Sequence, residues 1–246
     1  MKKVFFTLIA LISFNINSQS VEFQEYDLEN GLHVILHQDN NAPVVVTSVM
    51  YHVGAKDEDP DKTGFAHFFE HLLFEGTKNI ERGQWDIIVN SNGGRYNANT
   101  SPDRTYYYEV FPSNKLEIAL WLESDRMLQL KFDQRSLDIQ KKVVVEEFKE
   151  TSINKPYGDF WHELSDMAFK KHSYRWPTIG MKTEHIEDAE LDDVKEFFKK
   201  YYRPSNAILV ISGKIEIPHT KSLVEKWFGT IPSGENYSSQ IEAEPR

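Results

Sequence analysis

The chain has 246 residues, of which 40% are hydrophobic and 27% are charged, the composition of an ordinary globular protein. Its formal net charge of −10 disfavours nucleic acid as a partner, because phosphate binding requires a basic surface. The chain has no cysteine, so disulfides are excluded and any metal would be held by histidine and carboxylate groups.

The first 18 residues have the pattern of a signal peptide. Lys2 and Lys3 precede a short apolar run, and small or polar residues follow it. We expect cleavage after Ser18, with Ser20 as the alternative, and export to the periplasm or the medium. Losing both lysines would take the formal charge from −10 to −12. An uncleaved anchor is the competing interpretation, although the run is short for a membrane span, and no stable span is expected after cleavage.

In the first half of the chain the pattern predicts a hairpin, a strand and two helices. Asn30-Gly31 lies between alternating segments and predicts a two-residue hairpin turn. The strand is expected to end at Gly54, and Gly76 is expected to stop the first helix. The predicted ranges are 26–39 for the hairpin, 42–55 for the strand, and 65–75 and 82–94 for the helices.

The second half is predicted to begin with an aromatic-rich pair of strands and to continue with helices. Its helices are amphipathic, and one buried strand lies among them. Because strands and helices do not alternate strictly, the predicted fold class is α+β: a two-layer sandwich with an antiparallel-rich sheet and helices on one face. The predicted ranges are 95–112 for the strand pair, 114–130, 134–152, 156–169, 190–202 and 219–229 for helices, and 206–213 for the buried strand.

The stretch GFAHFFEHLLFEGT places three titratable residues in an apolar run. His67 and His71 are four residues apart, so on a helix they lie on one face and can bind one metal ion. Two imidazoles and one carboxylate leave a fourth zinc position open for water, as in catalytic sites. Glu70 lies near the same face and is the candidate base in this H-x-x-E-H order. The alternative is a helix with two satisfied core histidines and an exposed glutamate.

The later predicted helix KKVVVEEFKE contains two candidates for a third ligand, Glu146 and Glu147. Glu147 shares a helical stripe with Val143, Val144 and Phe148, which predicts that it faces inward, whereas Glu146 is expected to face solvent. An inward carboxylate costs several kcal/mol unless it is paired or binds a metal. The alternative is an ordinary acidic pair on the surface of a charged helix.

Several ordered motifs together resemble the N-terminal domain of the pitrilysin/insulinase family of zinc peptidases, particularly the shorter bacterial relatives of the mitochondrial processing peptidase. The resemblance runs through residues 22–245. It is carried by the segments NGLHVIL, YHVGAKDE, GFAHFFEHLLFEGT, NGGRYNANTSPDRTYYYEVFP, VVVEEFKE, HSYRWPTIG and YYRPSNAILVISG.

The resemblance implies a site and a domain plan. It maps the ligands of one Zn²⁺ ion per domain to His67, His71 and Glu147, and the catalytic base to Glu70. Many relatives have a supporting glutamate seven residues before the last ligand, where this chain has Gln140. The implied domain spans residues 19–235, and the polar residues 236–246 would begin an interdomain linker.

The resemblance also suggests how substrate and partner bind. In the family, a strand at Asn97, Ala98 and Asn99 forms an exposed edge that pairs with extended peptide, by strand addition. The alternative is a plain sheet strand. Family members also contain a second homologous domain or use a partner chain, so this chain is either a fragment or a subunit.

Three functions are compatible with these patterns. The first is an exported zinc endopeptidase acting on unfolded or short peptides. The second is a non-catalytic or partner-dependent subunit of a two-chain peptidase complex. The third is a zinc-stabilised structural domain, which would need no base beside an open metal position. The endopeptidase is favoured because the chain contains both histidines and the glutamate of the H-x-x-E-H motif and also Glu147.

Overall fold

The computed structural model describes residues 21–235 and 241–245. The predicted signal peptide, residues 1–18, lies outside the described residues, as do residues 236–240 and 246 of the predicted linker. Among the described residues, no helix combines the length and the apolar character needed to span a bilayer.

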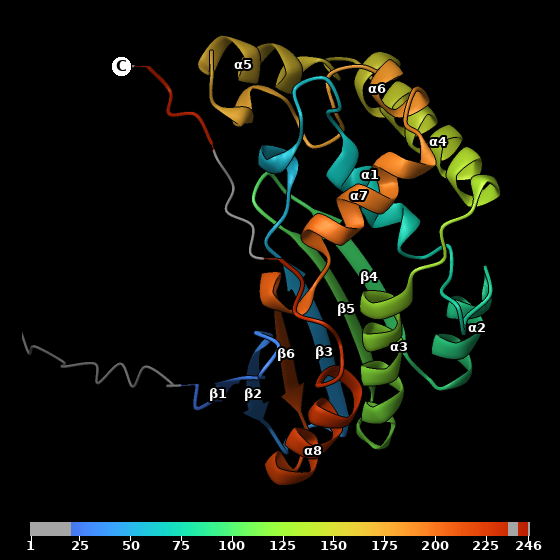
Figure 1. The fold of residues 1–246 in the computed structure, drawn as a ribbon, viewed down its shortest axis with the longest axis vertical. Coiled ribbons are helices and arrows are strands. Elements are labelled where there is room, and N and C mark those ends of the chain that lie inside the picture. Colours follow the sequence, from blue (N-terminus) through green and yellow to red (C-terminus); the bar gives the residue numbers. More distant parts are fainter. Residues whose placement is uncertain (1–20, 236–240, 246) are drawn as a thin grey trace, which may run out of the picture.

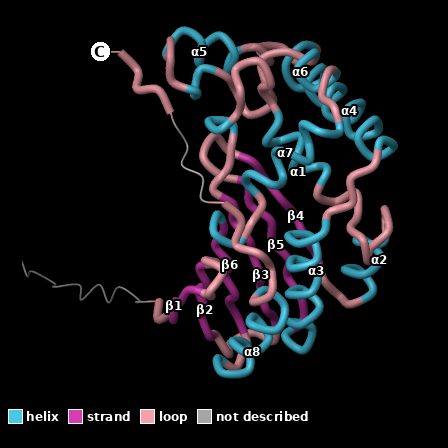
Figure 2. The backbone as a smooth tube through the Cα atoms, in the orientation of Figure 1, coloured by secondary structure: helices cyan, strands magenta, loops and turns pink. Residues whose placement is uncertain are grey.

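Six strands form one sheet in the order β1-β2-β6-β3-β5-β4. Neighbouring strands are antiparallel, except for β2 and β6, which are parallel. Figure 2 shows the strands side by side. Their bounds are β1 (Gln24–Asp27), β2 (His33–Gln38), β3 (Val44–Tyr51), β4 (Arg95–Thr100), β5 (Thr105–Pro112) and β6 (Ala207–Gly213).

Helices make up the second layer. Figure 1 shows α1, α4, α5 and α6 gathered towards one end of the molecule and α8 at the opposite end. The helix bounds are α1 (Phe65–Leu72), α2 (Gln84–Ser91), α3 (Leu116–Gln129), α4 (Gln134–Phe148), α5 (Phe160–Ala168), α6 (Glu184–Glu187), α7 (Leu191–Tyr201) and α8 (Ile217–Phe228).

The helices cover one face of the sheet. Along β5, residues Thr105, Tyr107, Glu109 and Phe111 are buried, whereas the residues between them are only half-buried. The alternation follows from the two-residue period of a strand, which sends successive side chains to opposite faces. Helix α3 packs against β3 and β5, and α1 packs against β4 and β5. The predicted α+β class is therefore confirmed.

A fully buried arginine joins the strand and helix layers next to α1. The Arg126 guanidinium forms ion pairs with Glu109 and Glu123, and all three side chains are at most 1% exposed. Burial raises the pKa of Glu109 well above its ordinary value, and the neighbouring Glu123 raises it further. The guanidinium also lies over three aromatic rings, those of Phe74, Trp85 and Tyr107.

The first hairpin forms, but its turn is longer than predicted. Strands β1 and β2 pair from Gln24↔Leu36 to Asp27↔His33, so residues 28–32 separate them. Asn30 is buried and donates from its amide to the carbonyls of Phe228 and Ile231. These contacts with the end of α8 hold a five-residue connection in place of a two-residue turn.

Two helices end earlier in the structure than the sequence pattern predicts. Helix α1 ends at Leu72, before the predicted residue 75, because the next bonds tighten to the i→i+3 type, from Phe74 N–H to His71 and from Glu75 N–H to Leu72. Helix α4 ends at Phe148 and continues as a wider turn over Lys149–Ile153, closed by an i→i+5 bond.

Candidate active site

Helix α1 separates its apolar and titratable side chains. Its buried residues are Phe65, Ala66, Phe68, Phe69 and Leu72. His67 and His71 lie on the other side and keep 14% and 26% of their side-chain surface exposed. The histidines are therefore not satisfied core residues, because both rings reach the surface on the side away from the core.

Three candidate ligand atoms from two helices converge on one point. The Nε2 atoms of His67 and His71 are 3.3 Å apart. Glu147 Oε2, on α4, lies 3.7 Å from His67 Nε2 and 3.5 Å from His71 Nε2. Ligands about 2.0–2.1 Å from a tetrahedral zinc ion lie about 3.3–3.4 Å from each other. The donor set and its spacing therefore fit a zinc ion.

Electrostatics favour the metal-binding protonation states of His67 and Glu147. Burial, together with the neighbouring His71, lowers the pKa of His67 to about 4. The hydrogen bond from His71 lowers the pKa of the Glu147 carboxyl, although its partial burial opposes this shift. A neutral imidazole and an ionised carboxylate are the forms that coordinate a metal.

Glu70 lies beside this cluster and is held by the neighbouring strand. The Thr100 hydroxyl on β4 donates to Glu70 Oε2 at 2.6 Å. Burial raises the pKa of Glu70, and the hydrogen bond from Thr100 partly opposes the shift. A carboxylate whose pKa moves towards neutrality is suited to general-base work.

A buried carboxylate fixes the beginning of α1. Glu58 is 6% exposed, and its two oxygens accept hydrogen bonds from the backbone N–H groups of Gly64 and Ala66 at 2.9 and 2.8 Å. They satisfy two of the donors that a helix leaves unpaired at its first turn. Burial raises the pKa of Glu58 to about 8, against the effect of these bonds. Gly64 has a φ of 85°, and an added Cβ would lie 2.7 Å from the Ile179 carbonyl, so this entry requires glycine.

Helix α4 is joined to the end of α1 by a second polar contact. Gln140 Nε2 donates to Glu75 Oε1 at 2.6 Å, and Arg82 Nε donates to Glu75 Oε2 at 2.5 Å. Gln140 lies two helical turns before Glu147, on the same face of α4. This contact connects the helix that carries the carboxylate ligand to the segment that follows the histidines.

The predicted buried stripe of α4, formed by Val143, Val144 and Phe148, is partly wrong. Val144 and Phe148 are buried, but Val143 is 44% exposed, and Val145 is buried in its place. The apolar stripe is therefore rotated by about a fifth of a turn, since one residue spans about 100°, so Glu147 lies at its margin and is half-buried. Glu146 is exposed as expected and forms a surface ion pair with Lys149.

The predicted peptide-binding strand lies at the edge of the sheet. Strand β4 is last in the strand order and pairs only with β5 in the described residues. The side chains of Asn97 and Asn99 are exposed, whereas Ala98 is half-buried. Asn99 Oδ1 accepts a hydrogen bond from Arg104 Nη1 at 2.6 Å. The strand has the edge position that peptide addition requires.

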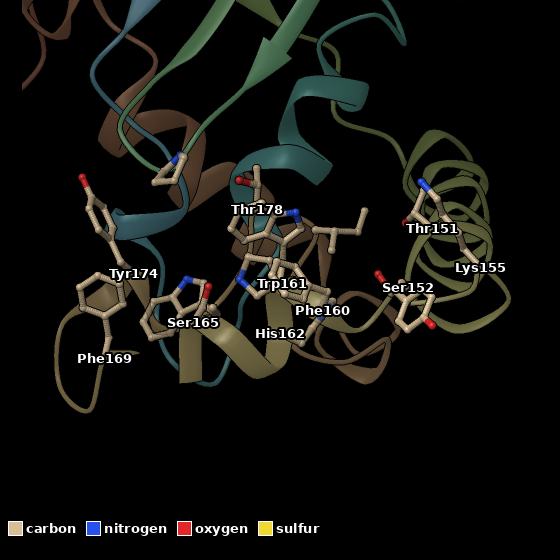
Figure 3. A pocket seen from close by; sticks show the side chains of 16 residues that line it. Thr151, Ser152, Lys155, Phe160, Trp161, His162, Ser165, Phe169, Tyr174 and Thr178 are labelled. Atoms are coloured by element: carbon tan, nitrogen blue, oxygen red, sulfur yellow. The ribbon is translucent and has the colours of Figure 1, made fainter. Parts of the chain in front are cut away.

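A cavity of about 750 Å³ opens between α5 and the segment after α4 (Figure 3). It begins one helical turn beyond the carboxylate ligand, since Thr151 lines it and donates from its hydroxyl to the Glu147 carbonyl. Phe160 and Trp161 line the cavity and are 53% and 63% exposed. Sequence patterns had indicated α5 but not this exposure of its aromatic residues.

Two histidines outside the cluster, His162 and His172, form ordinary contacts with nearby backbone groups. His162 Nε2 contacts the Gly180 carbonyl at 2.9 Å, and His172 Nδ1 accepts from the Tyr174 N–H. Thr100 was the residue of the site that sequence reasoning missed. Its signal was present, because it lies two residues after Ala98 and so shares its face of the strand.

Two peptidase family models match most of the sequence. The sequence model described as Insulinase (Peptidase family M16) matches residues 33–180, and the one described as Peptidase M16 inactive domain matches residues 188–246. The zinc protease PqqE of Helicobacter pylori is 32% identical over 227 residues, which cover 91% of this chain and 51% of that protein. A probable mitochondrial-processing peptidase subunit beta of Schizosaccharomyces pombe is 29% identical, with 86% of this chain and 46% of that protein covered.

Solved structures share the fold. A protease from Helicobacter pylori superposes with a TM-score of 0.87 at 31% identity, covering 92% of this chain and 55% of that chain. Pitrilysin superposes with a TM-score of 0.82 at 22% identity, which shows a common fold. The chain spans about half the length of the curated relatives it resembles. Since the first family model covers more than half of the sequence, the chain belongs to the insulinase family of peptidases, family M16.

Proposed function

We propose that this chain is the metal-binding half of a zinc endopeptidase that hydrolyses peptide bonds in unfolded or short peptides. The observation that carries the proposal is the spacing of three ligand atoms, with Nε2 of His67 and His71 and Oε2 of Glu147 separated by 3.3–3.7 Å. The curated relatives that are named zinc proteases support the same class of activity.

The proposed chemistry assigns one task to each group. His67, His71 and Glu147 would hold the zinc ion, which when bound would activate a water molecule and polarise the substrate carbonyl. Glu70 accepts the proton of the attacking water and can return it to the leaving amine. Since Glu70 Oε2 already accepts a hydrogen bond from the Thr100 hydroxyl, we assign the proton transfer to Oε1. General-base catalysis of this kind contributes roughly 10²–10⁴-fold to a rate.

The same geometry suggests how a peptide is held. An extended segment would add to the outer edge of β4 at Asn97, Ala98 and Asn99, which favours chains without stable structure of their own. The cavity beside α5 would receive an apolar side chain of that peptide, because Phe160 and Trp161 present aromatic surface to it. The wall of the cavity lies one turn past Glu147, about 5.4 Å along a helix.

We further propose that activity requires a second homologous domain or a partner chain. Residues 19–235 would form the zinc-bearing domain, and residues 236–246 would lead to the rest of the protein. The proposal is supported by the coverage of the relatives, of which this chain spans about half. Export to the periplasm or the medium is proposed from the N-terminal pattern alone.

A second candidate function is a subunit that binds zinc and peptide but contributes no hydrolysis. In that case this chain would be the inactive partner of a catalytic chain, which is compatible with the match of residues 188–246 to a model described as an inactive domain. The position of Glu70 beside the ligands favours the catalytic function, because a binding subunit has no use for a base there.

The test is hydrolysis of an unstructured, internally quenched peptide by zinc-loaded chain, alone and with the remaining half of the protein added. We expect slow cleavage by the chain alone and faster cleavage by the pair, since poor substrate alignment by about 1 Å costs roughly a hundredfold. Glu70→Gln should abolish cleavage and Glu146→Gln should not. Cleavage that survives Glu70→Gln would contradict the mechanism, and zinc binding without cleavage by the pair would favour the binding subunit.

A further inference from the structure

The backbone of β4 alternates between its partner strand and the outer edge of the sheet. The Ser101 N–H donates to the Arg104 carbonyl at 2.8 Å and closes the turn between β4 and β5. In an antiparallel pair, both backbone polar groups of a residue point to the same side, and that side changes at each residue. Since Ser101 points towards β5, the backbone groups of Ala98 and Thr100 point towards the outer edge.

An observed hydrogen bond agrees with this alternation of the backbone groups along β4. The Ala98 N–H bonds to Asn97 Oδ1 at 2.9 Å, and this acceptor belongs to an exposed side chain of the strand itself. The outer edge of β4 therefore presents the N–H and C=O groups of Ala98 and Thr100 to an added peptide strand. The Asn97 side chain accepts the hydrogen bond of the Ala98 N–H group and would have to move when a peptide binds there.

The side chain of Thr100 points to the reacting groups while its backbone faces the peptide edge. Its hydroxyl donates to Glu70 Oε2 at 2.6 Å, and Glu70 precedes the ligand His71 directly in α1. One residue thus contacts the candidate base through its side chain and the substrate position through its main chain.

We propose that Thr100 is a positioning residue that fixes the Glu70 carboxylate relative to a peptide bound along β4. The inference rests on the proposed endopeptidase function and adds a residue to it. A peptide that pairs with the Thr100 backbone would be placed by the same residue that orients the base. The Thr100 hydrogen bond would then hold the base on α1 in a fixed position relative to the substrate on β4.

The chain contains a matched control for this role. Thr105 lies directly opposite Thr100 in the β4–β5 register. Its hydroxyl donates to the Val53 carbonyl at 2.9 Å, and the residue is fully buried. Thr100→Val and Thr105→Val therefore remove the same atom type from facing positions, but only the first removes a contact with Glu70.

The main experiment compares Thr100→Val, Thr100→Ser and Thr105→Val with the wild-type chain in the peptide cleavage assay, with the remaining half of the protein added. We expect Thr100→Val to lower kcat about tenfold to a hundredfold with KM changed less than about twofold, because a displaced base affects the chemical step. Thr100→Ser should restore kcat. Thr105→Val should lower the melting temperature and leave kcat near the wild-type value.

A second measurement does not depend on turnover. A peptide hydroxamate binds zinc and also hydrogen-bonds the base, whereas the matching peptide amide makes neither contact. We expect Thr100→Val to weaken the hydroxamate about tenfold, to leave the amide unchanged and to keep stoichiometric zinc. Wild-type kcat and wild-type hydroxamate affinity in Thr100→Val would overturn the inference. Failure of the wild-type chain to bind zinc would contradict the proposed function instead.

Discussion

The contact between Gln140 and Glu75 is expected to control zinc affinity at a distance. We consider Gln140→Leu, which keeps most of the side-chain volume and removes the amide donor. In the wild type this donor lies 2.6 Å from Glu75 Oε1, and Glu75 is only 6% exposed. The substitution leaves half of a buried carboxylate without a partner, while Arg82 still binds the other oxygen.

The structure sets the size of the effect. Loss of a hydrogen bond to a buried charged group costs about 1.5–3 kcal/mol. Part of this cost should appear as weaker zinc binding, because Gln140 and Glu147 lie two turns apart on α4 whereas the histidines lie on α1. We expect the zinc dissociation constant to rise about tenfold, within the range of 10–100-fold found for residues that support metal ligands.

The assay is competition for zinc with a chromophoric chelator, combined with denaturant unfolding of the metal-free protein. Gln140→Glu should be at least as damaging, because it places two carboxylates together, and the exchange Gln140→Glu with Glu75→Gln should recover part of the affinity. Glu146→Gln is the control, since Glu146 is exposed on the same helix. A lower unfolding free energy with an unchanged zinc dissociation constant would refute the positioning argument.

Two further predictions concern acidity and the cavity. The pKa of His67 is about 4 in the folded metal-free chain and about 6.5 when unfolded, so the unfolded form binds more protons between these values. The free energy of unfolding should fall by about 2 kcal/mol from pH 7 to pH 5, and the fall should be smaller in His67→Gln; equal slopes by denaturant titration would contradict this. Trp161→Ala should raise KM for peptides with large apolar side chains about tenfold and change the melting temperature little, because Trp161 is 63% exposed. Met167→Ala, at an exposed residue outside the cavity lining, should leave KM unchanged, and an equal effect of both changes would exclude the cavity.

The convergence of the three candidate ligands was partly predictable from local geometry. The spacing of His67 and His71 fixes their common face on any helix, and the structure brings both to one point with Glu147. The resemblance supplied the pairing of α1 with α4, which spacing alone could not. The α+β class was likewise indicated by alternation and turn residues, whereas the edge position of the strand at Asn97, Ala98 and Asn99 came from the resemblance.

Other features depend on tertiary contacts that no local pattern contains. The exposure of Val143 follows from the way α4 packs, since neighbouring valines are equivalent in sequence. The hairpin turn at Asn30 is extended by carbonyls almost 200 residues away in the chain. The bond between Thr100 and Glu70 joins residues 30 positions apart and requires the distance between β4 and α1.

The most direct test of the central claim is the zinc content of purified chain after removal of loosely bound metal. We predict about one zinc per chain in the wild type and in Glu70→Gln, and almost none in His71→Ala, because the proposal assigns Glu70 as the base and His71 as a ligand. Stoichiometric zinc in His71→Ala, or its loss in Glu70→Gln, would contradict the assignment of these residues.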